Sequence, residues 1–216
     1  MKYSNDASGF VILSEYVPDI IEEVRYHTTY NFIGDKIDGY DDPIILVVLE
    51  AALALQKANE EAKKLGYAFK VYDAYRPQTA VDHFVRWAKD INDTRMKEIF
   101  YPETKKEELF EKGFIASKSG HTRGSSIDLT LFNLKTGKEV DMGGVFDNFG
   151  DVSHSSYTEG LTEEQINNRK LLHKIMIENG FKGINSEWWH FNLIDEPYPD
   201  TYFTFPIDKN LINKQK

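Results

Sequence analysis

Residues 119–132, SGHTRGSSIDLTLF, decide the fold because they join an irregular turn to a buried strand. Small residues in the first half predict a loop, and from Ile127 onward the sequence alternates with the period of two typical of a strand. Asp128 then lies in an otherwise apolar strand, where an unpaired carboxylate is costly to bury. A divalent cation shared with His121 would remove that cost. The alternative is that Asp128 pairs with Arg123 or with a backbone amide.

A second segment with metal-binding character is Glu187-Trp188-Trp189-His190. Its acid and its imidazole are three residues apart, so they can supply one ligand and one proton-transfer group to a single metal. Zinc in hydrolytic sites takes three protein ligands and leaves a position for water. A nearby carboxylate removes a proton as that water attacks. The two segments together predict His121, Asp128 and His190 as ligands, with Glu187 as the base.

Composition limits the classes of protein to consider. The chain has 216 residues, of which 41% are hydrophobic and 28% charged, which is compatible with one globular domain. Its net charge of -9 argues against binding to nucleic acid or to an anionic membrane surface. The absence of cysteine excludes disulfides, thiolate ligands and a cysteine nucleophile. Any zinc site must therefore consist of His, Asp and Glu.

The sequence contains no obvious targeting or membrane segment. Residues 1–19 carry one Lys and no continuous apolar core, so we expect no signal peptide. The longest apolar run, residues 44–55, is too short to span a bilayer and contains Glu50. We expect a cytoplasmic protein with a small-molecule substrate and without nucleic-acid or membrane partners; it could form a homo-oligomer.

The pattern of predicted elements is that of one α+β domain. A helix is expected to start at Asp41-Asp42-Pro43 and to end at Gly66, because apolar residues recur at helical spacing from Ile45 to Leu65. Other expected elements are a strand at 69–74, helices near 81–88, near 105–112 and from the capping box at 162–165 to Asn179-Gly180, a long loop at 141–158 and a strand at 187–194. We expect a single domain over 1–216, with residues 1–22 and the tail 207–216 peripheral.

The string SGHTRGSSIDLTL together with EWWH resembles the D-Ala-D-Ala dipeptidases of the vancomycin-resistance type. These are zinc D,D-peptidases of peptidase family M15, a group structurally related to the hedgehog signalling domain. The group's pattern is S-x-H-x-x-G-x-A-x-D followed by E-x-W-H, and here Ser126 stands in place of the usual Ala. Residues 73–77 (DAYRP), 141–147 (DMGGVFD) and 196–199 (EPYP) are also similar, so the resemblance covers about residues 23–206.

This resemblance implies a fold, a cofactor and roles for further residues. It implies helices around a central, mainly antiparallel sheet that carries one Zn²⁺ per chain. The implied reaction is hydrolysis of D-Ala-D-Ala by a Glu187-activated zinc water, with Arg76 stabilising the transition state. Asp147 is expected to receive the substrate ammonium with Tyr26 nearby, and Ser119 to help hold the C-terminal carboxylate. The implied role is removal of the cytoplasmic dipeptide, either in glycopeptide resistance or in cell-wall D-alanine recycling.

Two other functions are compatible with parts of the pattern. A zinc D,D-carboxypeptidase acting on peptidoglycan precursors would need a site open at the substrate's amine, and Asp147 argues against it. A non-catalytic zinc-binding module, conceivable from the hedgehog relation, would keep the ligands but lose the base or the arginine. This chain retains both Glu187 and Arg76.

Overall fold

The structure is a computed structural model that describes residues 1–213. Its strands are β1 (Lys2–Ser4), β2 (Phe10–Ile12), β3 (Ile21–Glu22), β4 (Leu46–Val48), β5 (Tyr67–Asp73), β6 (Ser126–Asn133), β7 (Lys138–Glu139), β8 (Phe181–Gly183), β9 (His190–Leu193) and β10 (Thr201–Phe203). Its α-helices are α1 (Leu13–Tyr16), α2 (Leu49–Lys64), α3 (Gln78–Lys89), α4 (Lys97–Phe100), α5 (Glu163–Glu178) and α6 (Lys209–Asn213). Short 3-10 helices are η1 (Arg25–His27), η2 (Lys106–Glu108), η3 (Gly120–Arg123) and η4 (Asp151–Ser153).

A mixed sheet with the strand order β3-β5-β6-β9-β8 forms the centre of the molecule. Only β3 pairs in parallel, with β5; the pairs of β6 with β5, β7 and β9, and of β8 with β9, are antiparallel. The register places Asp128 of β6 opposite both Asp73 of β5 and His190 of β9. Three polar side chains from distant parts of the sequence therefore meet in one row of an apolar sheet. This architecture confirms the predicted α+β fold with a mainly antiparallel sheet.

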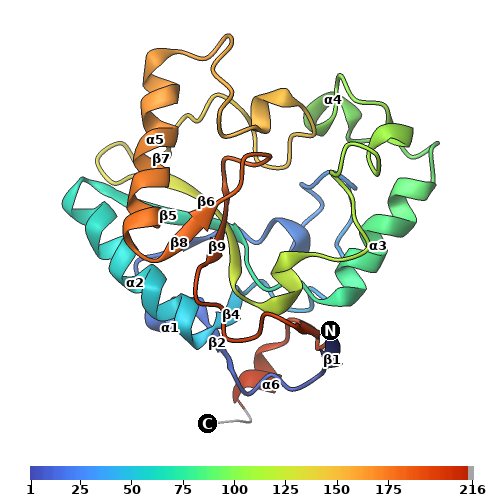
Figure 1. Cartoon of the computed structure of the whole chain (residues 1–216), viewed down its shortest axis with the longest axis horizontal. Helices are drawn as coiled ribbons and strands as arrows, with labels where there is room; N and C mark the ends of the chain where they lie inside the picture. The colour runs from blue at the N-terminus through green and yellow to red at the C-terminus, as the bar shows by residue number, and fades with distance from the viewer. Residues whose placement is uncertain (214–216) are drawn as a thin grey trace.

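The long helices lie on two sides of the molecule (Figure 1). Helices α2 and α5 contact each other and pack against β5 and β8, whereas α3 lies on the opposite side of the molecule (Figure 1). The capping box that predicted the start of α5 is present, because Thr162 and Gln165 bond reciprocally to each other's backbone amides. None of the helices within residues 1–213 is long and apolar enough to cross a membrane.

The prediction of a helix starting near residue 43 was wrong. Leu46, Val47 and Val48 form β4, which pairs antiparallel with β2, and α2 begins only at Leu49. All three β4 side chains are fully buried. A short apolar run matches a buried strand as well as a buried helix, so the arrival of β2 decided its conformation. The helix expected near residues 105–112 is only the 3-10 helix η2.

The N-terminal segment and the tail, expected to be peripheral, both contribute to the core. Phe10 packs its ring against Tyr75, Phe203 and Phe205 at centroid distances of 4.8–4.9 Å. Leu13 and, in the tail, Ile207 and Ile212 are also buried. One hydrophobic cluster extends from Ala7 to Ile212, which agrees with a single domain. Residues 214–216 of the predicted tail lie outside the described residues.

Candidate active site

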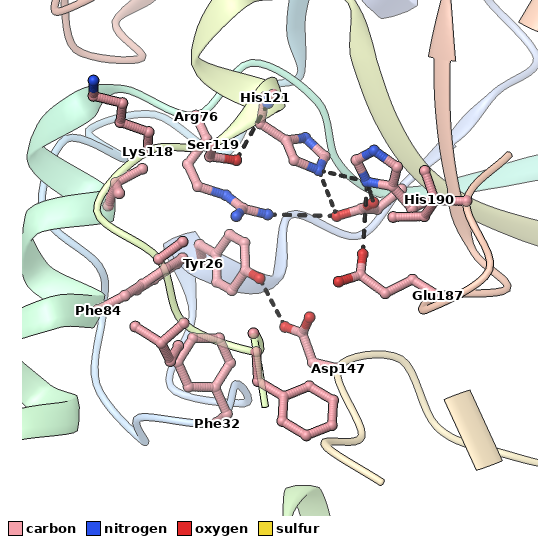
Figure 2. A pocket seen from close by; sticks show the side chains of 18 of the residues that line it. Tyr26, Phe32, Arg76, Phe84, Lys118, Ser119, His121, Asp147, Glu187 and His190 are labelled. Carbon is pink, nitrogen blue, oxygen red and sulfur yellow. Dashed lines mark hydrogen bonds and ion pairs between the residues drawn. The ribbon is translucent and has the colours of Figure 1, made fainter. Parts of the chain in front are cut away.

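Every residue predicted for the site lines one cavity of about 380 Å³ (Figure 2). The side chains come from six places in the fold: the 3-10 helix η1, the 3-10 helix η3 with its N-cap, the segment after β5, strand β6, the 141–158 loop, and the turn that leads into β9 with the first residue of that strand. These residues are Tyr26, Arg76, Ser119, His121, Asp128, Asp147, Glu187 and His190. Folding thus gathers side chains that are up to 164 positions apart (190 minus 26) around one space.

Three of these residues form a compact group of ligand atoms. His121 Nε2 lies 3.2 Å from Asp128 Oδ2, His190 Nδ1 lies 3.0 Å from Asp128 Oδ1, and the two imidazole nitrogens are 3.0 Å apart. His121 reaches this point because η3 turns the chain back, and the helix ends at Gly124 with φ +81°. A Cβ atom at Gly124 would lie 2.3 Å from the ring of Phe10, so only glycine fits there. Within residues 1–213 this is the group of His and acidic side chains with the geometry to hold a metal ion.

The hydrogen bonds behind the two imidazoles determine which nitrogens carry protons. His121 Nδ1 lies 2.7 Å from the carbonyl oxygen of Ala74, and His190 Nε2 lies 3.1 Å from Asn192 Oδ1. Oxygens of this kind only accept, so these nitrogens are the donors and the opposite nitrogens present lone pairs to each other. When both imidazoles are neutral, two lone-pair nitrogens and both oxygens of Asp128 converge on one point. This donor set fits a cation, with each imidazole oriented by a second hydrogen bond.

The charges at this group are consistent with that interpretation. Burial lowers the pKa of His121, which keeps its imidazole neutral. Burial also acts to lower the pKa of His190, but the neighbouring Asp128 carboxylate outweighs it, so the pKa is raised when no cation is present. A divalent ion would displace the proton that this imidazole otherwise takes up.

Glu187 lies beside the ligand group but is not part of it. Its Oε2 is 3.6 Å from His190 Nδ1. The side chain retains 33% of its exposure because it faces the cavity, which is open to solvent. The protein around it nevertheless raises the pKa of this carboxyl group through burial. A carboxylate with a raised pKa, next to a metal position, is suited to accept a proton.

The guanidinium of Arg76 points into the same cavity (Figure 2). Its Nε and Nη2 each lie 2.9 Å from Asp73 Oδ2, and Nη2 lies 3.5 Å from Asp128 Oδ2. Asp73 is fully buried and also accepts a hydrogen bond of 2.6 Å from the hydroxyl of Tyr40. The guanidinium is 5.1 Å from the centre of the Tyr26 ring. Arg76 is therefore fixed in place by a buried carboxylate and an aromatic face.

Asp147 lies across the cavity from the ligand group, and Tyr26 donates a hydrogen bond of 2.7 Å to it (Figure 2). Asp147 is the non-glycine residue with positive φ, +63°, among those described. Such a left-handed conformation persists only where the surroundings impose it, and it is concentrated at functional sites. Burial raises the pKa of Asp147 well above its usual range, and the nearby charge of Asp128 adds to the effect. A cation arriving here would remove that cost.

Ser119 makes a structural hydrogen bond and also lines the cavity. Ser119 Oγ accepts a hydrogen bond of 3.2 Å from the amide of His121, which caps η3, and the side chain also lines the cavity. Lys118 points away from the other labelled side chains (Figure 2). The alternative pairing of Asp128 with Arg123 does not occur, because Arg123 bonds to Glu196 at 2.8 and 3.1 Å.

Sequence reasoning missed several side chains that shape the cavity. Asp73 and Asn192 orient site residues, and each had a weak signal: an acid inside an apolar strand, and a polar residue two positions after His190 on the same face of a strand. The wall is aromatic, and no local pattern indicated its members, which are Phe32, Phe84 and Phe149.

Comparison with known proteins gives consistent matches over nearly the whole chain. Residues 6–208 match a family model described as D-ala-D-ala dipeptidase. The chain is 44% identical over 200 residues to a D-alanyl-D-alanine dipeptidase of Enterococcus faecalis, covering 93% of this chain and 98% of that protein. Dipeptidases of the same name from Enterococcus faecium and Streptomyces coelicolor are 42% and 40% identical, each match covering 92% of this chain and 98% of the relative.

Proposed function

The chain belongs to the D-Ala-D-Ala dipeptidase family, and from this premise we propose how its cavity hydrolyses the dipeptide into two molecules of D-alanine. The proposal assigns a zinc ion to the ligand group, the proton transfer to Glu187, and recognition of the charged ends of the substrate to the opposite wall. The observation that carries it is the convergence of two lone-pair imidazole nitrogens and one carboxylate on a single point.

We propose that His121, Asp128 and His190 hold one zinc ion per chain. Two imidazoles and a carboxylate are a ligand set of catalytic zinc, which leaves one position for water or substrate. When bound, zinc supplies Lewis-acid polarisation of the scissile carbonyl and lowers the pKa of water. The hydrogen bonds from His121 to Ala74 and from His190 to Asn192 support this assignment, because they orient both rings before the ion arrives.

Glu187 is the residue that accepts a proton from the attacking water and passes it to the leaving amine. Its carboxylate stands beside the ligand group without belonging to it. Because burial raises the pKa of Glu187, the protonated form is accessible midway through the reaction. The same side chain can therefore act first as a base and then as an acid.

Arg76 stabilises the negative charge that develops on the carbonyl oxygen of the scissile amide. Its guanidinium lies within 3.5 Å of Asp128 and is oriented by Asp73, so it needs no rearrangement to face a substrate next to the ligands. Preorganised charge of this kind in an enclosed site usually contributes most to lowering such barriers.

Recognition of a free dipeptide requires partners for both charged ends. Asp147, whose burial without a cation is unfavourable, is suited to the substrate ammonium, and Tyr26 orients its carboxylate. Ser119 lines the cavity and has a hydroxyl hydrogen available to donate to the C-terminal carboxylate. The role in glycopeptide resistance or in cell-wall dipeptide turnover stays a prediction.

The test is release of D-alanine from D-Ala-D-Ala by the purified chain, before and after treatment with a chelator, and again after zinc is added back. We expect hydrolysis that disappears with the metal and returns with it, and no hydrolysis of L-Ala-L-Ala. Hydrolysis at an unchanged rate, after elemental analysis has verified that the metal is gone, would overturn the proposal.

A further inference from the structure

One side chain of helix α5 hydrogen-bonds to both arms of the loop that carries Asp147. Residues 141–154 leave the sheet after β7, pass the cavity at Asp147 and return through η4. Loops of this length have many conformations unless other groups fix them. At residues 142, 152 and 154 the two ends of this loop meet the guanidinium of Arg169 from helix α5.

The three hydrogen bonds that the Arg169 guanidinium donates all go to backbone carbonyls of the loop. Its Nε donates to the oxygen of Met142 at 2.6 Å, Nη2 to that of Val152 at 2.9 Å and Nη1 to that of His154 at 3.2 Å. The first bond lies five residues before Asp147, and the other two lie five and seven residues after it. One planar, rigid fork of donors thus ties both arms of the loop together, a geometry that lysine cannot supply.

The burial of Arg169 is otherwise unexplained. The side chain is buried, it forms no ion pair with a carboxylate of residues 1–213, and its guanidinium lies 5.5 Å from the ring centre of Trp188. Burial lowers the pKa of Arg169 to about 10, so the group is still a cation at neutral pH. A buried cation is costly to desolvate unless it is paired or hydrogen-bonded. The three hydrogen bonds from Arg169 to the loop carbonyls meet this requirement, and they indicate that the side chain holds the loop in place.

We propose that Arg169 is a positioning residue that holds the 141–154 loop so that Asp147 faces the substrate ammonium. This inference rests on the proposed function of Asp147. Aromatic contacts act in the same direction: Phe146, the neighbour of Asp147, stacks on Tyr72 at 4.5 Å and meets Trp189 edge to face at 5.4 Å. Arg169 fixes the ends of the loop and Phe146 its middle, which leaves Asp147 in the left-handed conformation that the site requires.

The test compares kcat and KM for D-Ala-D-Ala and for N-acetyl-D-Ala-D-Ala, which lacks the ammonium, in the zinc-loaded protein. Arg169→Ala should lower kcat/KM for the free dipeptide by about 10- to 100-fold, mainly through KM, as expected when a binding group is displaced by a fraction of an ångström or more. The acetylated dipeptide does not use Asp147, so its kcat/KM should change much less. The ratio of kcat/KM for the free dipeptide to kcat/KM for the acetylated dipeptide should therefore decrease.

Arg169→Lys keeps the charge and most of the volume but cannot bond all three carbonyls. Its ratio of kcat/KM for the free dipeptide to kcat/KM for the acetylated dipeptide should therefore lie between the ratios of wild type and Arg169→Ala. Arg169→Lys also decides the question alone if Arg169→Ala does not fold. Lys170→Ala, at the next and exposed position of α5, is the matched control and should behave as wild type. Bound zinc should be equal in all four proteins.

The inference would be overturned if both Arg169 variants prefer the free over the acetylated dipeptide as strongly as wild type does, even with lower activity or stability. A merely structural role would lower kcat/KM for both substrates in proportion. A wild-type protein that does not prefer the free dipeptide contradicts the role of Asp147 instead. One that releases no D-alanine contradicts the proposed function itself.

Discussion

The two ends of the cavity are held in different ways. The end with the candidate metal ligands, here called the metal end, consists of His121, Asp128 and His190. Asp128 and His190 lie directly opposite each other on the paired strands β6 and β9. The other end, which we propose binds the substrate ammonium and call the ammonium end, consists of Tyr26 and Asp147, which lie on a 3-10 helix and on a long loop. Strand register and second hydrogen bonds orient the first end. At the second end, Arg169 of α5 bonds to the loop, and Phe146 stacks on Tyr72.

This difference indicates how chemistry and selectivity are divided in the molecule. Groups that take part in bond breaking need a fixed geometry, and paired strands supply it more accurately than loops do. A group that only recognises an ammonium tolerates more displacement, and a loop allows it to be tuned separately. We therefore expect changes at the metal end to abolish turnover, and changes at the ammonium end to alter which substrate is used.

The largest effect is expected at the metal end. His121→Ala, Asp128→Ala and His190→Ala each remove one of three ligands, so bound zinc and D-alanine release should both fall to background. Elemental analysis and the release assay measure the two losses. Stoichiometric zinc in all three variants would mean that the metal lies elsewhere.

The next largest effect should separate base from ligand. Glu187→Gln keeps the shape of the side chain but cannot accept a proton, so activity should fall by about 10²- to 10⁴-fold while zinc is retained. A folded but zinc-free Glu187→Gln protein would instead assign Glu187 to the metal end as a ligand.

Arg76 connects the two ends, and its loss should act on the rate. Arg76→Ala should lower kcat by roughly 10²- to 10³-fold, the effect of removing one oxyanion donor, with a smaller change in KM. Arg76→Lys keeps the charge without the fork and should be intermediate. A normal kcat with a raised KM would show that Arg76 binds only the ground state.

At the ammonium end the effect should be smaller and selective. Asp147→Asn removes a charge-assisted hydrogen bond of about 1.5–3 kcal/mol, so kcat/KM for D-Ala-D-Ala should fall by about 10- to 100-fold. Acetylation of the substrate should lower kcat/KM far more in wild type than in Asp147→Asn. If wild type cuts the acetylated dipeptide or a precursor pentapeptide as well as D-Ala-D-Ala, the site is open at this end and the carboxypeptidase function takes its place.

The smallest effect is expected from Tyr26→Phe. This change removes only the 2.7 Å hydrogen bond to Asp147 and leaves the ring against Arg76. Tyr26 acts on the substrate only through Asp147, so only part of the free energy of this bond, about 1 kcal/mol, should be lost on binding. KM should then rise by less than about 10-fold, with kcat and zinc content unchanged. A loss of kcat as large as in Arg76→Ala would mean that the tyrosine acts on the reaction itself.

The residues of the metal end and the strand that carries Asp128 could be predicted from the sequence. Their signals are local: an acid inside an apolar strand, small residues that allow a tight turn, and an acid and a histidine three positions apart. The start of α5 could be predicted for the same reason, since its capping box lies within four consecutive residues. Such local patterns can be recognised in a sequence because the interactions behind them join residues only a few positions apart.

Only the tertiary structure decided the features that depend on contacts between distant segments. β4 is a strand because β2 pairs with it, although its residues match a helix equally well. The N-terminal segment belongs to the core because Phe10 fills a space between residues 75, 203 and 205. Arg169 closes a loop whose sequence contains no sign of it. Whether a residue is buried, and which group it hydrogen-bonds to, depends on two segments that meet only in the folded chain. The sequence of either segment alone therefore does not predict it.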